Sequence, residues 1–213
     1  MFKNIFRFFA MVMCNQEKAM PYSAEHKAEV RKRIVEKARI LFNRHGFEGV
    51  SIDQIMAEAG LTRGGFYNHF RNKEELYSEA VSSFLHGRGK IWRDEAGVDP
   101  MNGGPQTVQA MIRSYLSSGH LNDLDGHCPM IALPSDVARA TPEVRSSYES
   151  LLRAMVGLFQ HNMDTEGDTR EKALVLASVC VGTMILSRTV EDSALADELR
   201  SAAGKFTKVY QSG

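Results

Sequence analysis

The sequence predicts an all-α protein of about nine helices that form two domains. Along most of the chain, apolar residues recur every three or four positions, which is the period of an amphipathic helix, and no sustained two-residue alternation indicates a strand. The length of 213 residues, with 43% apolar content, suits one small domain and one of about 140 residues. Each expected element follows from a local pattern.

A long first helix is expected to end at Gly46, because Gly46 followed by Phe47 suits a glycine C-cap. The apolar residues that mark this helix are Val30, Ile34, Ala38, Leu41 and Phe42. Basic and acidic side chains mix on its outer surface, as they do on most solvated helix faces. Lys27 and Arg31 are the two candidates for binding a partner, since they lie near the end that approaches the next turn.

The segment 51–70 predicts two short helices joined by a tight turn. Ser51 suits an N-cap, and Gln54 can complete a capping box with it. The first helix therefore begins at about Ile52 and ends at Gly60, which can adopt the left-handed conformation that terminates helices. Thr62 is expected to cap a second helix of about two turns, which is too short to stand without neighbours.

The outer face of that second helix favours contact with DNA. Each glycine inside a helix costs about 1 kcal/mol relative to alanine, so Gly64 and Gly65 suit a backbone that a major-groove floor must approach closely. Arg63 can hydrogen-bond to guanine edges. Donors for phosphate oxygens are present in Thr62, Tyr67 and His69. The alternative is an ordinary surface helix whose turn needs glycine.

Residues 25–76 resemble the DNA-binding domain of the TetR family of bacterial transcriptional repressors. The resemblance lies in the run Gly-Phe-Glu-Gly-Val-Ser-Ile-Asp-Gln-Ile-Met-Ala-Glu-Ala-Gly-Leu-Thr-Arg-Gly-Gly-Phe-Tyr-Asn-His-Phe-Arg-Asn-Lys-Glu-Glu-Leu, residues 46–76. It implies a three-helix DNA-binding domain at residues 23–71. It also implies a helical regulatory and dimerisation domain at residues 72–213, which begins with a connecting helix.

The resemblance further implies a repressor that binds a palindromic double-stranded DNA operator as a homodimer and responds to a small-molecule effector. Two recognition helices would meet half-sites roughly 34 Å apart, or a multiple of that spacing. By position, the implied phosphate contacts are Ser51, Thr62, Tyr67, His69 and Lys73. The residues implied to face bases are Arg63, Gly64 and Gly65.

The composition fits a cytoplasmic regulator and excludes some other classes. The formal net charge is zero, so DNA binding must depend on a local patch presented by two copies, which disfavours an architectural DNA binder. Cys14, Cys128 and Cys180 lie far apart without a metal-ligand spacing. We therefore expect no disulfide framework, metal, cofactor or membrane partner.

Residues 1–22 form an N-terminal extension that precedes these patterns. It is basic and then apolar like a signal peptide, but the apolar run is short, interrupted and without an Ala-x-Ala-like site. The run Met20-Pro-Tyr-Ser resembles the usual opening of a TetR-family repressor. We therefore expect a mis-assigned translation start or, alternatively, an extra N-terminal helix packed against the body.

The connecting helix begins at about Lys73 and contains Gly87 and Gly89, which are expected to bend or end it. Glycine, proline and polar residues then predict a loop at residues 95–105. The loop separates this helix from the body of the regulatory domain.

The body of the regulatory domain is expected to contain further amphipathic helices. One helix covers residues 108–116, and a loop follows at residues 118–127. Pro129 opens another helix, which Pro134 is expected to kink. Thr141 and Pro142 suit the N-cap and first residue of the next helix.

The last two helices are the expected dimer surface. From Ala173 to Leu186 apolar residues occupy nearly every side, so this helix needs cover from its own domain and from a partner. This stretch is too short to span a membrane. The final helix is amphipathic, and the two helices can form a four-helix interface across a two-fold axis. The candidate interface residues are Leu174, Ala177, Val181, Ile185, Leu195, Leu199 and Phe206.

An apolar cavity between helices of the regulatory domain is expected to hold the effector. Such cavities are lined mainly by apolar and aromatic side chains, although each of these residues can equally belong to the ordinary core. The candidate lining residues are Trp92, Met111, Tyr115, Cys128, Met130, Leu133, Met155, Phe159 and Met184.

Cys128 is a candidate sensor residue because it precedes Pro129 at an expected helix N-terminus, where the helix dipole and free amides favour a thiolate. Some TetR-family repressors that respond to electrophiles or oxidants carry a cysteine at this kind of position, usually directly after a glycine. Here His127 separates Gly126 from Cys128. The alternative is a small buried residue at the helix start.

An enzyme is the competing class. His120, Asp125, His127 and Cys128 cluster in sequence and resemble a Cys/His nucleophile site in composition alone. They share one irregular loop without an oxyanion-hole or orienting signature. We therefore do not expect an enzyme.

Overall fold

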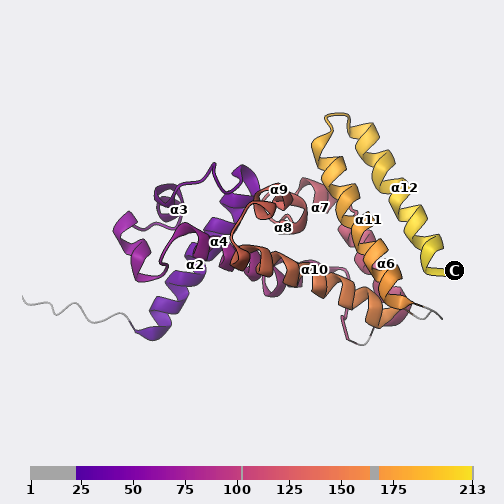
Figure 1. Ribbon diagram of the computed structural model, residues 1–213, viewed down its shortest axis with the longest axis horizontal. Helices are drawn as coiled ribbons and strands as arrows, with labels where there is room; N and C mark the ends of the chain where they lie inside the picture. Colours follow the sequence, from indigo (N-terminus) through magenta and orange to yellow (C-terminus); the bar gives the residue numbers. More distant parts are fainter. Residues whose placement is uncertain (1–22, 102, 164–167, 213) are drawn as a thin grey trace, which may run out of the picture.

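The computed structural model describes residues 23–101, 103–163 and 168–212. The extension at residues 1–22, expected to reflect a mis-assigned start or an extra helix, lies outside them. Within the described ranges every regular element is helical, which confirms the all-α class. Figure 1 shows an elongated molecule with the N-terminal helices at one end and the last helices, in orange and yellow, at the other.

Three helices form the N-terminal unit: α2 (Ala24–His45), α3 (Ile52–Glu58) and the 3-10 helix η1 (Arg63–Asn68). The Ser51 hydroxyl accepts from the Gln54 amide at 3.2 Å, and Gln54 Oε1 accepts from the Ser51 amide at 2.8 Å, so the predicted capping box is present. Gly60 has the expected left-handed conformation, with a φ of 69°. The three helices share a core that contains Ile34, Phe42, Ile55, Met56 and Phe66.

The second short helix differs from the prediction. It is a 3-10 helix instead of two α-turns, and the Thr62 side chain makes no capping hydrogen bond although Thr62 is the N-cap residue. Two adjacent glycines disfavour an α-helix, and 3-10 geometry is common in such short segments. Phe66 and Phe70 are buried and hold η1 on the unit.

The connecting helix is divided at Gly87 into α4 (Lys73–His86) and α5 (Arg88–Glu95). The predicted interruption is therefore present. A Cβ on Gly89 would lie 2.7 Å from the Phe84 ring and 2.8 Å from the Phe84 carbonyl oxygen. Glycine at position 89 thus allows the start of α5 to pass closely over the end of α4.

Four short segments follow: α6 (Gly104–Tyr115), α7 (Ser118–Asn122), α8 (Pro129–Ala132) and α9 (Pro134–Ala138). The expected loop at 118–127 contains α7, whose start is capped by the Ser117 hydroxyl. Five residues are too few to show helical periodicity in a sequence. Pro134 begins a separate helix instead of kinking one, because a proline lacks the amide proton that would continue α8.

Three long helices complete the fold: α10 (Pro142–Asn162), α11 (Thr169–Thr189) and α12 (Ser193–Ser212). α10 packs against both α4 and α11, and α11 pairs with α12 at the far end of the molecule (Figure 1). α4 also packs against α2. A single helix therefore contacts both the N-terminal unit and the body of the regulatory domain.

α11 is longer than the stretch Ala173–Leu186 that the sequence marked as apolar. At 21 residues it is long and apolar enough to cross a membrane by length and composition alone, so the prediction that it is too short is wrong. A helix in the core of a water-soluble domain meets the same criteria. α11 is packed between α10 and α12.

Candidate DNA interface and regulatory cavity

The outer surface of η1 is exposed and small. Tyr67 is 59% exposed, and the neighbouring Arg63 and Gly64 are exposed as well. A Cβ on Gly64 would meet no atom within 4 Å, so packing within the protein does not require glycine there. Glycine is needed at this position only if an external surface approaches the backbone closely.

Arg63 is held by an acidic partner in the free protein. Its guanidinium lies 2.5 Å from the Asp53 carboxylate of α3, and both side chains are more than half exposed. An exposed ion pair of this kind contributes little to stability. The guanidinium is therefore available to a stronger acceptor, at the expense of separating it from Asp53.

Arg31 is committed to contacts within the protein. Its guanidinium donates to the Glu79 carboxylate of α4 and to the His69 carbonyl oxygen, and it lies 4.0 Å above the Phe70 ring. A further ion pair joins it to Glu75 at 3.4 Å. This corrects the expectation that Arg31 is available to bind a partner, because Arg31 instead joins α2, the end of η1 and α4.

Lys73 has a similar structural role. Its ammonium group donates to the carbonyl oxygens of Phe47 at 2.8 Å and Val50 at 3.0 Å, and it lies 4.0 Å from the centre of the Phe47 ring. Two of its three donors thus hold the turn that leads into α3. The expectation that Lys73 is free for a phosphate is corrected accordingly.

The other DNA-contact candidates lie on the same end of the molecule. Lys27, Ser51 and Thr62 are exposed. His69 is half-buried, and burial, followed by the charges of Lys27 and Arg31, lowers its pKa, which favours the neutral imidazole near neutral pH. His69 can therefore donate only one hydrogen bond to a phosphate.

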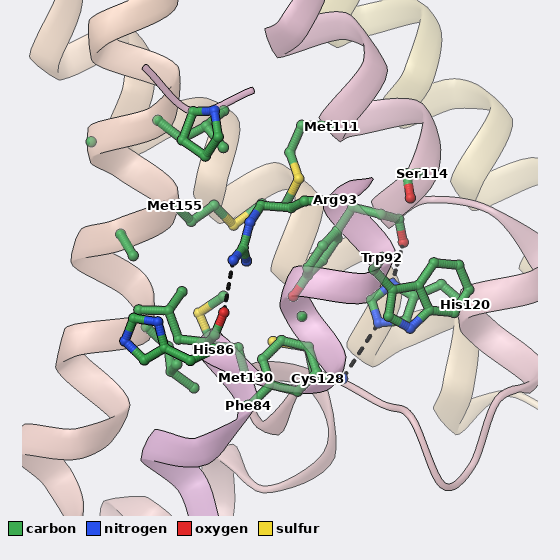
Figure 2. Close-up of a pocket in the computed structure, with 18 of the residues that line it drawn as sticks. Phe84, His86, Trp92, Arg93, Met111, Ser114, His120, Cys128, Met130 and Met155 are labelled. Carbon is green, nitrogen blue, oxygen red and sulfur yellow. Dashed lines mark hydrogen bonds between the residues drawn. The ribbon is translucent and has the colours of Figure 1, made fainter. Parts of the chain in front are cut away.

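A cavity of about 470 Å³ lies in the regulatory domain, lined by residues from α4, α5, α6, α7, α8 and α10 and by residues that flank these helices. Figure 2 shows Trp92 and His120 on one side and Met155 and His86 on the other. The end of α4 forms part of the wall through Phe84 and His86. The cavity thus adjoins the helix that also packs on the N-terminal unit.

Six of the nine expected cavity residues are in the wall: Trp92, Met111, Tyr115, Cys128, Met130 and Met155. The other three, Leu133, Phe159 and Met184, are at most 3% exposed and belong to the packed core. Their expected place in the wall is corrected, because neighbouring side chains cover them. Apolar spacing identifies a buried helix face but does not distinguish a filled space from an empty one.

Several wall residues were not predicted. They include Arg93, Ser114, His86, His120 and His161. Arg93 directly follows Trp92, but charged residues on a short helix are ordinarily solvated, so the sequence contains no sign that Arg93 reaches inward. The Arg93 guanidinium donates to the Leu85 carbonyl oxygen at 2.7 Å (Figure 2).

Cys128 is a buried thiol, not a thiolate. It is 1% exposed, and burial raises its pKa to about 11, against smaller opposing contributions from nearby donors and Arg93. The helix that it precedes, α8, has only four residues. This corrects the expectation that a helix dipole favours ionisation here, because loss of hydration outweighs it.

The neighbouring histidines are bonded to the backbone. His120 Nδ1 lies 2.8 Å from the Tyr115 carbonyl oxygen, and His127 Nε2 lies 2.8 Å from the Leu121 carbonyl oxygen. Burial lowers the pKa of His120 to about 4 and lowers the pKa of His127. Neither ring is paired with the Cys128 sulfur as a general base would be.

The loop before Cys128 is fastened to α2. Arg39 donates to the Asp125 carbonyl oxygen at 2.6 Å, and Asn43 donates to the His127 carbonyl oxygen at 2.8 Å. Arg44 also forms an ion pair with the Asp125 carboxylate at 2.5 Å. The wall of the cavity and the first helix of the N-terminal unit are therefore joined by short polar contacts.

Apolar side chains are exposed along α11 and α12. The large residues among them, between 42% and 74% exposed, are Leu174, Leu186, Leu195, Phe206 and Val209. Of the other expected dimer residues, Val181, Ile185 and Leu199 are half-buried. Ala177 is fully buried within the chain, so its expected place in a dimer interface is corrected.

The sequence model of the bacterial regulatory proteins of the TetR family matches residues 34–80, which span the second half of α2 through the first half of α4. The transcriptional regulator TtgW of Pseudomonas putida is 36% identical over 98 residues, which cover 46% of this chain and 69% of TtgW. The chain belongs to the TetR family.

Two other relatives show how the resemblance is distributed along this TetR-family chain. The TetC protein of transposon Tn10 from Escherichia coli is 46% identical over 52 residues, which cover 24% of this chain and only 26% of TetC. A transcriptional regulator from Saccharomonospora viridis, solved in complex with choline, has a TM-score of 0.64 at 19% identity and covers 85% of this chain and 96% of its own. Sequence similarity to TetC is thus confined to about a quarter of each chain, whereas the fold of the Saccharomonospora viridis protein matches 85% of this chain.

Proposed function

We propose that this protein is a repressor that binds a palindromic operator as a homodimer and leaves it when a small molecule occupies the cavity. The observation that carries the proposal is that α4 both packs on the N-terminal unit and forms part of the cavity wall. A molecule in the cavity therefore contacts the helix on which the DNA-reading unit is mounted. The site of action would be the cytoplasm.

In this proposal the exposed face of η1 enters the major groove. Arg63 leaves Asp53 to contact a guanine, while Gly64 and Gly65 allow the backbone to approach the base edges. The proposed phosphate contacts are Lys27, Ser51, Thr62, Tyr67 and His69. Arg31 and Lys73 support this face from within.

Dimerisation supplies the affinity for DNA that a single chain of zero net charge lacks. The exposed apolar side chains of α11 and α12 form a surface that a second copy can cover across a two-fold axis. The two N-terminal units of one rigid dimer recognise two half-sites. Once the first unit is bound, the second contact forms at high effective concentration. The neutral net charge of the chain makes this duplication necessary.

Two connections can transmit the effector signal. One runs through α4, which Arg31 ties to α2 and to the end of η1. The other runs through the Cys128 loop, which Arg39 and Asn43 tie to α2. A change in wall shape at either place alters the position of the reading head relative to its partner in the dimer.

Filling the cavity is expected to abolish the response to effectors and to leave DNA binding intact. Gly157 lines the cavity at an exposed position of α10, and a Cβ there meets no atom within 4 Å, so Gly157→Phe should introduce a ring at the cavity with little disturbance of the backbone. The variant should retain wild-type operator affinity but should no longer be released by compounds that release the wild type. Operator binding is measured by fluorescence anisotropy during a screen of small organic acids, amines and neutral aromatic compounds.

The matched control for that experiment is Arg153→Phe, which adds the same ring on an exposed part of α10 outside the cavity. It should respond to compounds as the wild type does. If Gly157→Phe also responds normally, effectors act elsewhere and the cavity is not the regulatory site.

We infer that Cys128 serves as part of the cavity wall and not as a thiol sensor. With a pKa of about 11, the thiolate fraction at neutral pH is very small and grows about tenfold per pH unit. The rate of alkylation of Cys128 by iodoacetamide should therefore rise about tenfold from pH 7 to 8 and again to pH 9. Peptide mass spectrometry measures this rate separately for each cysteine.

Operator release provides the functional side of the Cys128 test. Brief treatment with the alkylating agent at pH 7 should leave operator affinity unchanged in the wild type and in Cys128→Ser. A rate that is already maximal at pH 7, together with operator release that Cys128→Ser lacks, would instead establish the redox or electrophile sensor.

A further inference from the structure

The cavity wall has an unusual balance of charge. Among the described residues that line it there is one arginine, Arg93, and no aspartate or glutamate. The remaining wall is mainly apolar, with three histidines, and burial keeps His120 neutral by lowering its pKa to about 4. The fixed charge that faces this space is therefore positive.

The Arg93 guanidinium is incompletely paired. Within the described part of the chain its only hydrogen bond joins one terminal nitrogen to the Leu85 carbonyl oxygen, and no carboxylate lies within ion-pair distance. The adjacent Asp94 carboxylate is paired with Lys90 at 2.5 Å. Because a guanidinium carries five N–H donors, most of the donors of Arg93 remain for another acceptor.

Two more polar groups in the wall lack suitable partners. The indole Nε1 of Trp92 is buried without a hydrogen bond, and the Tyr115 hydroxyl is buried without an oxygen or nitrogen partner. The thiol of Cys128, a weak hydrogen-bonding group, lies beside that hydroxyl. Buried polar atoms without a partner also occur away from the cavity, in Tyr77 and Thr141 for example, so these two groups add polarity to the wall but do not by themselves identify a ligand.

We propose that the cavity binds an apolar organic acid, whose hydrocarbon body lies against the methionine and aromatic side chains and whose carboxylate pairs with Arg93. A planar guanidinium matches a carboxylate through two parallel hydrogen bonds, and a partly dehydrated site strengthens them. This inference rests on the proposed function and names the class of effector. A cation such as choline, which occupies the Saccharomonospora viridis protein, would meet an arginine here and no carboxylate.

The position of Arg93 also suggests how the acid is sensed. Arg93 lies on α5, and its contact with Leu85 spans the break between α5 and the last turn of α4. A carboxylate that binds this guanidinium therefore acts directly at the end of the helix that reaches the DNA-reading unit. An apolar molecule without an acid group fills the cavity but does not engage this contact.

Three probes with one hydrocarbon body test the proposal: 4-cyclohexylbutanoate, 4-cyclohexylbutanamide and 4-cyclohexylbutylammonium. Trp92 is the single tryptophan of the chain and lies in the wall, so its fluorescence reports occupancy, and these probes do not absorb in its range. At pH 7.5 the acid should bind at least tenfold more tightly than the amide, and the ammonium probe should bind most weakly.

Variants at two arginines identify the charge that is responsible. Arg93→Met, which keeps an apolar chain of similar length, should remove the preference for the acid while the affinity for the amide changes less than about threefold. Arg93→Lys should retain part of the preference and serves if the methionine variant does not fold. Arg113→Met, at an exposed arginine of α6 outside the wall, should behave as the wild type.

The inference and the proposed function fail in different ways. Equal or tighter binding of the amide or the ammonium probe, no binding of the acid at millimolar concentration, or an acid preference that survives Arg93→Met would each overturn the organic-acid class. Acid that binds with the expected preference but leaves the operator complex intact would support the class and contradict the proposed release mechanism.

Discussion

Arg31→Ala is expected to abolish operator binding by releasing η1, although Arg31 itself need not touch DNA. The guanidinium joins Glu79, the His69 carbonyl oxygen and the Phe70 ring, and its side chain is 32% exposed. Loss of these charge-assisted contacts, discounted for partial exposure, should lower the free energy of unfolding by about 2 to 3 kcal/mol. Urea denaturation measures the stability, and fluorescence anisotropy measures operator affinity.

Salt dependence distinguishes this role from a phosphate contact. Lys27→Ala, at an exposed lysine on the same helix, should weaken binding moderately and reduce the slope of log affinity against log salt by about one, as loss of one phosphate contact does. Arg31→Ala should lose affinity at every salt concentration. A stable Arg31→Ala protein with only the reduced slope would show that Arg31 binds phosphate after all.

Leu186→Glu is expected to separate the dimer and thereby lower operator affinity by about 10² to 10⁴-fold. Leu186 is 54% exposed in the single chain, so a glutamate there costs little in the monomer. Across a two-fold axis the same change buries two like charges close together. Sedimentation equilibrium measures the assembly state, and anisotropy with full and half operators measures the affinity.

The control for the dimer experiment is Leu124→Glu. Leu124 is 51% exposed, almost as much as Leu186, but lies in the loop after α7 and not on α11 or α12. This variant should remain dimeric and bind the operator normally. A dimeric Leu186→Glu protein would place the interface on another surface.

Local patterns predicted the parts of the structure that local interactions determine. The Ser51 capping box, the left-handed Gly60 and the interruption at Gly87 all depend on residues within a few positions of one another. α7 was missed because it has only five residues, and η1 was expected as an α-helix because its tight geometry leaves no separate signal in the sequence.

The roles of the charged residues could not be predicted in the same way. Arg31 finds Glu79 48 positions away, and Lys73 finds Phe47 26 positions away, so only the folded chain shows that these cations are occupied. For Arg93 the difference is the reverse. Its neighbours in sequence suggest a side chain in water, whereas in the folded chain it lines the cavity. In each case tertiary packing, and not local spacing, decides whether the charge faces water, protein or a cavity.

The pairing of Arg63 with Asp53 has a consequence for how the regulator searches a genome. In the proposed complex the carboxylate would compete with phosphates for the guanidinium, and would repel the backbone, while the protein moves over unrelated DNA. Residence on wrong sites should therefore be short. Because the pair is exposed and weak, a base pair that offers the arginine two good acceptors readily compensates for breaking it. In the proposed complex Asp53 would therefore add a small penalty to every encounter that lacks such acceptors, which sharpens discrimination slightly.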